Sequence, residues 1–254
     1  MILARILASA MLLPAIALTL GIARAQEDAT VLVYHRFGPV VADSMTVTTP
    51  VFEAQLKFLR DHGYAPVPLR EVVEFVAGRG TLPARAVAIT ADDGHRTVFT
   101  EMKPLAERYR VPITLFIYPS AISNASYAMT WEELAELKKT GLFTIESHTY
   151  WHPNFRIEKA RLSADAYRRF VETQFTKSRE VLERRLDIKV DLLSWPFGIV
   201  DDSLIEMARG TGYVAGFTIE RHHASRADNV MAIPRYIVTD HDRGAAFAAI
   251  LEGR

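Results

Sequence analysis

Two groups of polar residues in this sequence could together hold a metal ion. Asp92 and Asp93 come directly after an apolar run, and His148 and His152 stand four residues apart at the end of another. Alone, the first group also fits a solvated Asp-Asp-Gly turn, and the second fits two unrelated surface histidines. If both runs are parallel strands of one sheet, their ends meet at one edge. Two imidazoles and one carboxylate would then leave open positions on a divalent cation, as a water-activating metal site requires.

A third apolar run ends in an aromatic turn, Trp195-Pro196-Phe197-Gly198. Proline restricts the residue before it to extended backbone, so this stretch is expected to be extended and then turned. Beside a metal site it could form an apolar wall or present a backbone N–H to a reacting group. Core aromatics that close one end of a barrel fit the same composition equally well.

The composition narrows the chemistry further. The 254 residues include no cysteine, so disulfides, thiolate nucleophiles and cysteine-ligated metals are excluded. Lys and Arg number 30 and Asp and Glu number 30, which gives no electrostatic reason to expect a nucleic-acid partner. A hydrophobic fraction of 49% with 24% charged residues is typical of globular proteins. Any metal or nucleophile chemistry must therefore come from His, Asp, Glu, Ser or water.

Residues 1–25 are predicted to be a secretory signal peptide. One basic residue, Arg5, precedes a largely apolar run, and Ala23-Arg24-Ala25 gives a small-x-small cleavage pattern. A retained membrane anchor is the alternative, but Pro14 interrupts the run, which is near the lower length limit for spanning a bilayer. We therefore expect cleavage after Ala25 and no stable membrane insertion afterwards. The exported protein, periplasmic or extracellular, is expected to be one domain, residues 26–254.

Short apolar runs alternate with amphipathic helical patterns along the rest of the chain. The runs are too short for helices and rich in β-branched and aromatic residues, so they predict seven buried strands. Strand–helix alternation predicts a parallel sheet, and about seven strands favour an α/β fold, a distorted (β/α) barrel. The expected strands are 31–35, 86–90, 113–118, 143–148, 190–195, 214–218 and 233–238, and the expected helices are 48–62, 130–139, 162–186 and 202–210.

Three of these segments resemble the signature motifs of the polysaccharide deacetylases, carbohydrate esterase family 4. The segments are 90–94 (TADDG), 148–153 (HTYWHP) and 195–198 (WPFG), in this order and spacing. The opening 33–36 (VYHR) and the late 233–235 (IPR) are similar to the branch that contains bacterial poly-N-acetylglucosamine deacetylases. The resemblance covers roughly 31–238, and the distorted (β/α) barrel that it implies agrees with the alternation above.

The resemblance implies a metal-dependent hydrolysis. Asp93, His148 and His152 would hold a divalent metal, which is often zinc in the family, and Asp92 would act as general base on a water molecule. The backbone N–H of Phe197 would stabilise the oxyanion together with the metal. The products would be acetate and a free amine. Aromatic residues beside the motifs are the candidates for substrate binding, and they are Tyr150, Trp151 and Trp195.

The sequence departs from the family pattern at two functional positions. Ser194 stands where the third motif usually has the arginine that orients the catalytic aspartate, and Arg235 is expected to take over that task. The histidine that serves the family as general acid has no clear match. His241 is the nearest candidate, with His222 or His223 behind it.

The function that the sequence predicts is an exported, metal-dependent hydrolase that removes N-acetyl groups from an N-acetylglucosamine-containing polysaccharide. Removal of O-acetyl groups from a glycan would use the same chemistry. A carbohydrate-binding module with degenerate catalysis is motivated by Ser194 and by the missing acid motif, and a purely structural metal site is a third alternative. The expected partner is an acetylated polysaccharide or oligosaccharide. Poly-N-acetylglucosamine, chitin-like oligomers and peptidoglycan all fit.

Overall fold

The computed structural model of the protein describes residues 27–254. The expected signal peptide, 1–25, lies outside the described residues, so cleavage and export stay predictions. Across 27–254, no helix has both the length and the apolar character needed to cross a membrane.

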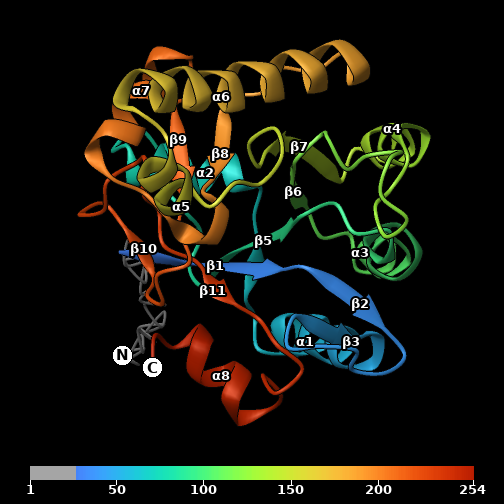
Figure 1. The fold of residues 1–254 in the computed structure, drawn as a ribbon. Helices are drawn as coiled ribbons and strands as arrows, with labels where there is room; N and C mark the ends of the chain where they lie inside the picture. The colour runs from blue at the N-terminus through green and yellow to red at the C-terminus, as the bar shows by residue number, and fades with distance from the viewer. Residues whose placement is uncertain (1–26) are drawn as a thin grey trace, which may run out of the picture.

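A curled, largely parallel sheet forms the centre of the fold (Figure 1). Its main path runs β10-β1-β5-β6-β7-β8-β9, with β11 paired to β1 and β4 paired to β5, and only the β1–β10 pairing is antiparallel. A separate parallel pair joins β2 (Arg36–Gly38) to β3 (Thr46–Thr48). The strands of the main sheet are β1 (Asp28–Tyr34), β4 (Ala65–Pro66), β5 (Ala86–Asp92), β6 (Ile113–Ile117), β7 (Phe143–Ser147), β8 (Leu192–Ser194), β9 (Ala215–Phe217), β10 (Ala224–Ser225) and β11 (Tyr236–Ile237).

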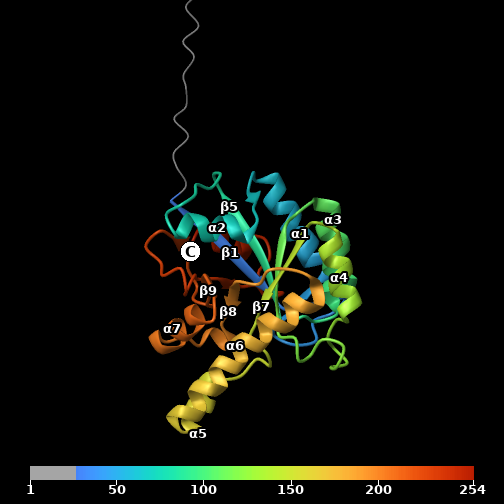
Figure 2. The same ribbon diagram turned by 90° about the horizontal axis from the view of Figure 1, so that it is seen from above.

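Helices surround this sheet on its outer side. In Figure 2, α1, α3, α4 and α6 follow one another around the curl, and α2 lies across the sheet from them. The helices of the described chain are α1 (Thr49–Asp61), α2 (Leu69–Val76), α3 (Lys103–Tyr109), α4 (Trp131–Lys139), α5 (Phe155–Arg161), α6 (Ala164–Leu186), α7 (Asp202–Gly210) and α8 (Ala245–Leu251), with a π-helical turn at Val98–Met102 and a 3-10 turn at Pro196–Gly198.

The predicted fold class is confirmed. Each of the seven predicted strands overlaps an observed strand, and the four predicted helices correspond to α1, α4, α6 and α7. The predicted capping box of α4 is present, since Thr130 Oγ1 accepts the Glu133 N–H at 3.2 Å while the Glu133 carboxylate accepts the Thr130 N–H at 2.8 Å. The barrel is distorted because β9 meets the segment before β11 only at an isolated bridge, Phe217–Ile233.

Both faces of the sheet are buried, which explains why its strands appear as continuous apolar runs. In β5, Val87 and Ile89 belong to the large cluster between the sheet and the outer helices. Ala88 faces the other way, into a smaller cluster inside the curl that α2 covers. Because side chains alternate along a strand, Thr90 and Asp92 continue the inward row that Ala88 begins. The fold therefore turns Asp92 toward the interior.

Candidate metal centre

The ends of β5, β7 and β8 bring the predicted site residues together. The three strands are parallel and linked through β6, so their carboxyl ends lie on one edge of the sheet. Asp92 is the last residue of β5, and His148 comes directly after β7. Both side chains are buried, whereas Asp93, one residue beyond its strand, keeps 25% of its side chain exposed. The predicted meeting of carboxylates and imidazoles is therefore observed.

Asp93, His148 and His152 form a cluster with the donor atoms of a metal site. One ligand atom from each residue lies within 4.8 Å of the other two. Asp93 Oδ1 is 3.6 Å from His148 Nε2 and 3.7 Å from His152 Nε2. Two imidazole nitrogens and one carboxylate oxygen facing a common point suit zinc and related divalent metals.

The protonation state of His148 suits a metal ligand. Its Nδ1 is 2.8 Å from the Ser194 carbonyl oxygen, which can only accept, so Nδ1 carries the proton and Nε2 presents a lone pair toward Asp93. Burial lowers the pKa of His148 to about 3, although the nearby Asp92 opposes that shift. The ring is therefore neutral near pH 7. Burial also lowers the pKa of His152.

The backbone of the site is held in left-handed conformations. Asp93 has φ 73°, Thr149 φ 63°, His152 φ 62° and Phe197 φ 57°. Residues with a Cβ rarely adopt this region, and a β-branched residue such as threonine adopts it least readily. Strained backbone of this kind persists only where the surrounding structure fixes it, and it gathers at functional sites.

Asp92 is held by a buried arginine. Arg235 donates from Nη1 to Asp92 Oδ1 at 2.9 Å and from Nη2 to Oδ2 at 2.7 Å, and Ser194 Oγ donates to Oδ2 at 2.8 Å. Burial alone would raise the pKa of Asp92, but Arg235 and then His148 hold it well below its ordinary value. Burial raises the pKa of the neighbouring Asp93. The pKa values of the two adjacent carboxyl groups are therefore shifted in opposite directions, and Asp92 is ionised near pH 7. Arg235 contacts the aspartate that the sequence predicted it would orient.

The predicted aromatic residues divide into exposed and buried members. Trp151 is 52% exposed and Phe197 is 55% exposed, and the Phe197 ring lies edge-on to His152 with centroids 4.6 Å apart. Tyr150 is half-buried, with Lys177 Nζ 4.1 Å from its ring centroid. Trp195 does not belong with them. It is 1% exposed and its Nε1 donates to the Met231 carbonyl at 2.8 Å, so it has no free face for a sugar.

Two of the three histidines considered as general acids, His222 and His223, make their contacts away from the Asp92–Asp93 pair. His223 is at the amino end of β1, where its Nδ1 is 3.4 Å from Asp28, and this is the opposite end of the sheet from the site. His222 is exposed near Glu220 and Asp228. His241 is exposed on the turn after β11.

His35 is the functional candidate that the sequence reasoning missed. It comes directly after β1, the strand beside β5, and its side chain interacts electrostatically with Asp92 and Asp93. Burial lowers its pKa and both carboxylates oppose that shift. Its Nδ1 is buried and has no hydrogen-bond partner within the described chain. The signal in the sequence was only partial: His35 ends a predicted strand, but the sequence does not show that this strand lies beside β5.

Comparisons with known proteins agree with this geometry. The family profile described as "Polysaccharide deacetylase" matches residues 79–216, which is more than half of the chain. A Staphylococcus aureus (strain MRSA252) protein named poly-beta-1,6-N-acetyl-D-glucosamine N-deacetylase is 26% identical over 200 residues, covering 77% of this chain and 68% of that protein.

Solved structures show the same fold. IcaB from Ammonifex degensii aligns with TM-score 0.79 and 24% identity, covering 90% of this chain and 99% of that one. The Streptococcus pyogenes deacetylase PplD, solved in complex with acetate, aligns with TM-score 0.79 and 19% identity, covering 88% and 98%. Because the profile match spans more than half of the chain, the chain belongs to the polysaccharide deacetylase family, carbohydrate esterase family 4.

Proposed function

We propose that this protein is an exported, metal-dependent N-deacetylase of a polysaccharide built from N-acetylglucosamine, with a β-1,6-linked polymer as the first substrate to test. The observation that carries the proposal is the cluster of Asp93, His148 and His152 beside the ionised Asp92. The Staphylococcus aureus relative, named for action on poly-beta-1,6-N-acetyl-D-glucosamine, supports the choice of polymer.

The three clustered side chains are the proposed metal ligands, and zinc is the proposed metal. A divalent metal bound there would lower the pKa of a water molecule and polarise the acetyl carbonyl. Asp92 is the proposed general base, since Arg235 and Ser194 fix its orientation and keep it ionised. It takes the proton that the water loses as the water oxygen attacks the acetyl carbon.

His35 is the proposed proton donor to the leaving amine. Burial lowers the pKa of His35, Asp92 and Asp93 oppose that shift, and its buried Nδ1 leaves a hydrogen-bonding position unused. The proton goes to the amide nitrogen as the bond between that nitrogen and the acetyl carbon breaks. The products are acetate and a free amine. His35 replaces His241 in this role, because His241 is exposed outside the cluster.

Phe197 and the aromatic rim are the proposed contacts to the substrate. The left-handed turn at Phe197 follows β8 and lies against His152, where its backbone N–H would stabilise the developing oxyanion. Trp151 and Tyr150 follow His148 along the same loop. Trp151 is exposed and Tyr150 is half-buried, and an accessible aromatic ring can stack on a sugar face. Trp195 is left out of the substrate-binding set because it is buried.

Deacetylation of a panel of glycans tests the proposal. Purified 26–254 is incubated with β-1,6-linked N-acetylglucosamine oligomers, chitin oligomers and an O-acetylated xylan, and acetate release is measured with and without chelator. We expect chelator-sensitive release from the β-1,6-linked oligomers. Asp92→Asn should abolish release and retain metal, whereas His148→Ala should lose metal. A normal rate of acetate release by Asp92→Asn would show that Asp92 is not the general base. Release from the xylan alone would make the protein an O-acetyl esterase, and bound metal without turnover would favour a binding module.

A further inference from the structure

The loop from Ser147 to His152 carries two of the three proposed metal ligands in a strained conformation. Thr149 and His152 both have left-handed backbone, and Thr149 is fully buried. A β-branched residue in this region costs free energy that neighbouring contacts must offset. His152 N–H donates to Thr149 Oγ1 at 3.2 Å, so the conformation of Thr149 and the position of His152 are linked. What restrains Thr149 therefore restrains a metal ligand.

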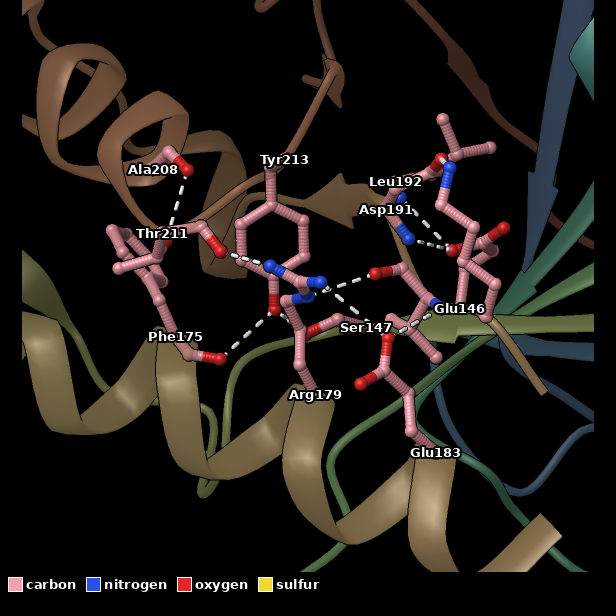
Figure 3. A network of polar contacts seen from close by, with 12 residues as sticks. Glu146, Ser147, Phe175, Arg179, Glu183, Asp191, Leu192, Ala208, Thr211 and Tyr213 are labelled. Carbon is pink, nitrogen blue, oxygen red and sulfur yellow. Dashed lines mark hydrogen bonds and ion pairs between the residues drawn. The ribbon is translucent and has the colours of Figure 1, made fainter. Parts of the chain in front are cut away.

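A buried hydroxyl on the outer face of β7 provides that restraint. Ser147 Oγ accepts from the Tyr213 hydroxyl at 2.7 Å (Figure 3). It also accepts from Thr149 N–H at 3.2 Å and lies 2.8 Å from Ser178 Oγ. A serine hydroxyl offers one donor and two acceptor positions, and these three contacts use all of them. All of the side chains involved are buried, so each lost partner would leave a costly unsatisfied group.

Helix α6 contributes two polar side chains that packing alone does not explain. Its buried face is mostly apolar, with Val171, Phe175 and Leu182, yet Gln174 and Ser178 are also buried there, one turn apart. Buried polar groups destabilise a protein unless they are hydrogen-bonded. Gln174 Oε1 accepts the Trp151 N–H at 3.1 Å, and Ser178 meets Ser147. Both polar side chains thus hold the loop that lies between the two histidines.

Tyr213 is itself anchored independently of the site. Figure 3 shows its hydroxyl directed toward Ser147 and the Phe175 carbonyl, which it reaches at 3.1 Å. The guanidinium of Arg179 lies 5.7 Å from its ring centroid and donates to the Val190 and Thr211 carbonyls. The tyrosine is therefore a fixed support to which the loop is attached.

We infer that four buried residues are positioning residues of the metal centre. They hold residues 147–152, the histidine loop, in the metal-binding conformation before the metal binds, and they are Tyr213, Ser147, Ser178 and Gln174. The inference rests on the proposed metal site. None of the four belongs to the cluster of Asp93, His148 and His152, and their effect is to lower the free-energy cost of ordering His148 and His152 for metal binding.

Metal affinity and ligand geometry test this role in the full folded protein. Tyr213→Phe and Ser178→Ala should each weaken zinc binding by about three- to tenfold, measured by competition with a chelating dye, because each removes one buried hydrogen bond from the support. The visible absorption bands of the cobalt(II)-substituted protein should shift in both variants. Tyr34→Phe is the matched control, since it removes another buried tyrosine hydroxyl, one that donates to Gln55 at 2.9 Å away from the loop.

The outcomes distinguish the positioning role of these residues from the proposed metal site on which it depends. If Tyr213→Phe and Ser178→Ala bind zinc as tightly as the wild type, with an unchanged cobalt spectrum, while melting like Tyr34→Phe, the four residues are structural only. If the wild type binds no zinc, or His148→Ala binds it as tightly as the wild type, the metal centre is wrong and the inference falls with it. Should Tyr213→Phe not fold, Ser178→Ala decides the question.

Discussion

Arg235 donates to both carboxylate oxygens of Asp92, at 2.9 and 2.7 Å, and both side chains are buried inside the curled sheet. The three remaining donors of the guanidinium are satisfied as well, since Nε donates to the Thr218 carbonyl at 3.0 Å, Nη1 to Thr90 Oγ1 at 3.1 Å and Nη2 to Ser194 Oγ at 2.7 Å. A two-point contact of this kind fixes the orientation of a carboxylate as well as its charge. Asp92 can therefore stay ionised beside Asp93.

Replacing Arg235 with lysine keeps the charge and removes the two-point contact. We expect kcat/KM for acetate release to fall by at least about tenfold, because Asp92 loses its fixed orientation. The melting temperature should also fall, since breaking a buried ion pair leaves poorly compensated charge. Arg226→Lys is the control, an exposed arginine that donates to the Gly80 carbonyl. Equal kcat/KM in Arg235→Lys and wild type would show that the pair does not orient the base.

Ser194→Ala should have a smaller effect than Arg235→Lys. The substitution removes one donor to Asp92 Oδ2 but leaves both arginine contacts and the Ser194 carbonyl that fixes His148. We expect a decrease in kcat of about three- to tenfold, in line with one buried hydrogen bond, with zinc affinity unchanged. Loss of zinc in this variant would mean that the hydroxyl supports the metal ligands and not the base.

His35→Gln tests the proposed proton donor. We expect kcat to fall by about a hundredfold, within the usual contribution of a general acid, while zinc stays bound because His35 lies outside the ligand cluster. His241→Gln, the exposed histidine after β11, should keep wild-type kcat. The reverse ranking of the two variants would restore His241 as the acid.

Asp240 gives the protein a pH-dependent contribution to stability away from the site. Its Oδ1 accepts the Thr48 N–H at 2.8 Å and the Thr48 hydroxyl at 2.7 Å, at the start of α1. Burial would raise the pKa of Asp240, but the Thr48 hydrogen bonds and Arg243 lower it below its ordinary value. Because the folded pKa lies below the unfolded one, the stabilisation is complete above about pH 4. It is lost as pH falls through the folded pKa.

Asp240→Asn should therefore melt below the wild type at pH 6 and approach it as the pH falls toward 3. Melting temperatures measured across that range check the prediction. Curves that stay parallel would show that Asp240 has the same pKa in the folded and unfolded protein.

The strands were predictable because both faces of the sheet are buried, as the run of buried residues through β5 shows. Once the strands are predicted, Asp92 and His148 can be placed together as well, because the carboxyl ends of parallel strands lie on one edge of the sheet. The substrate-binding role predicted for Trp195 is wrong, and the core position that fitted the composition equally well is the one observed, because the direction of its side chain depends on register. Ser194 faces Asp92, so the next side chain, Trp195, faces outward. There the centroid of the Trp195 ring lies 5.9 Å from that of Phe175.

His35 and the support of the histidine loop were not predictable from a single sequence. The place of His35 depends on β1 lying beside β5, a neighbour relation that strand patterns do not specify. Gln174, Ser178 and Tyr213 are distant in sequence from the loop they contact. A polar residue on an apolar helical face is a visible signal, but its partner is fixed only by tertiary packing.

The most direct test of the central claim is acetate release from β-1,6-linked N-acetylglucosamine oligomers by metal-free protein titrated with zinc. The account predicts no release without metal, a rise that saturates at a single zinc equivalent, and no rise in His152→Ala at that zinc concentration. Release that is equal with and without zinc, or a full response in His152→Ala, would contradict it.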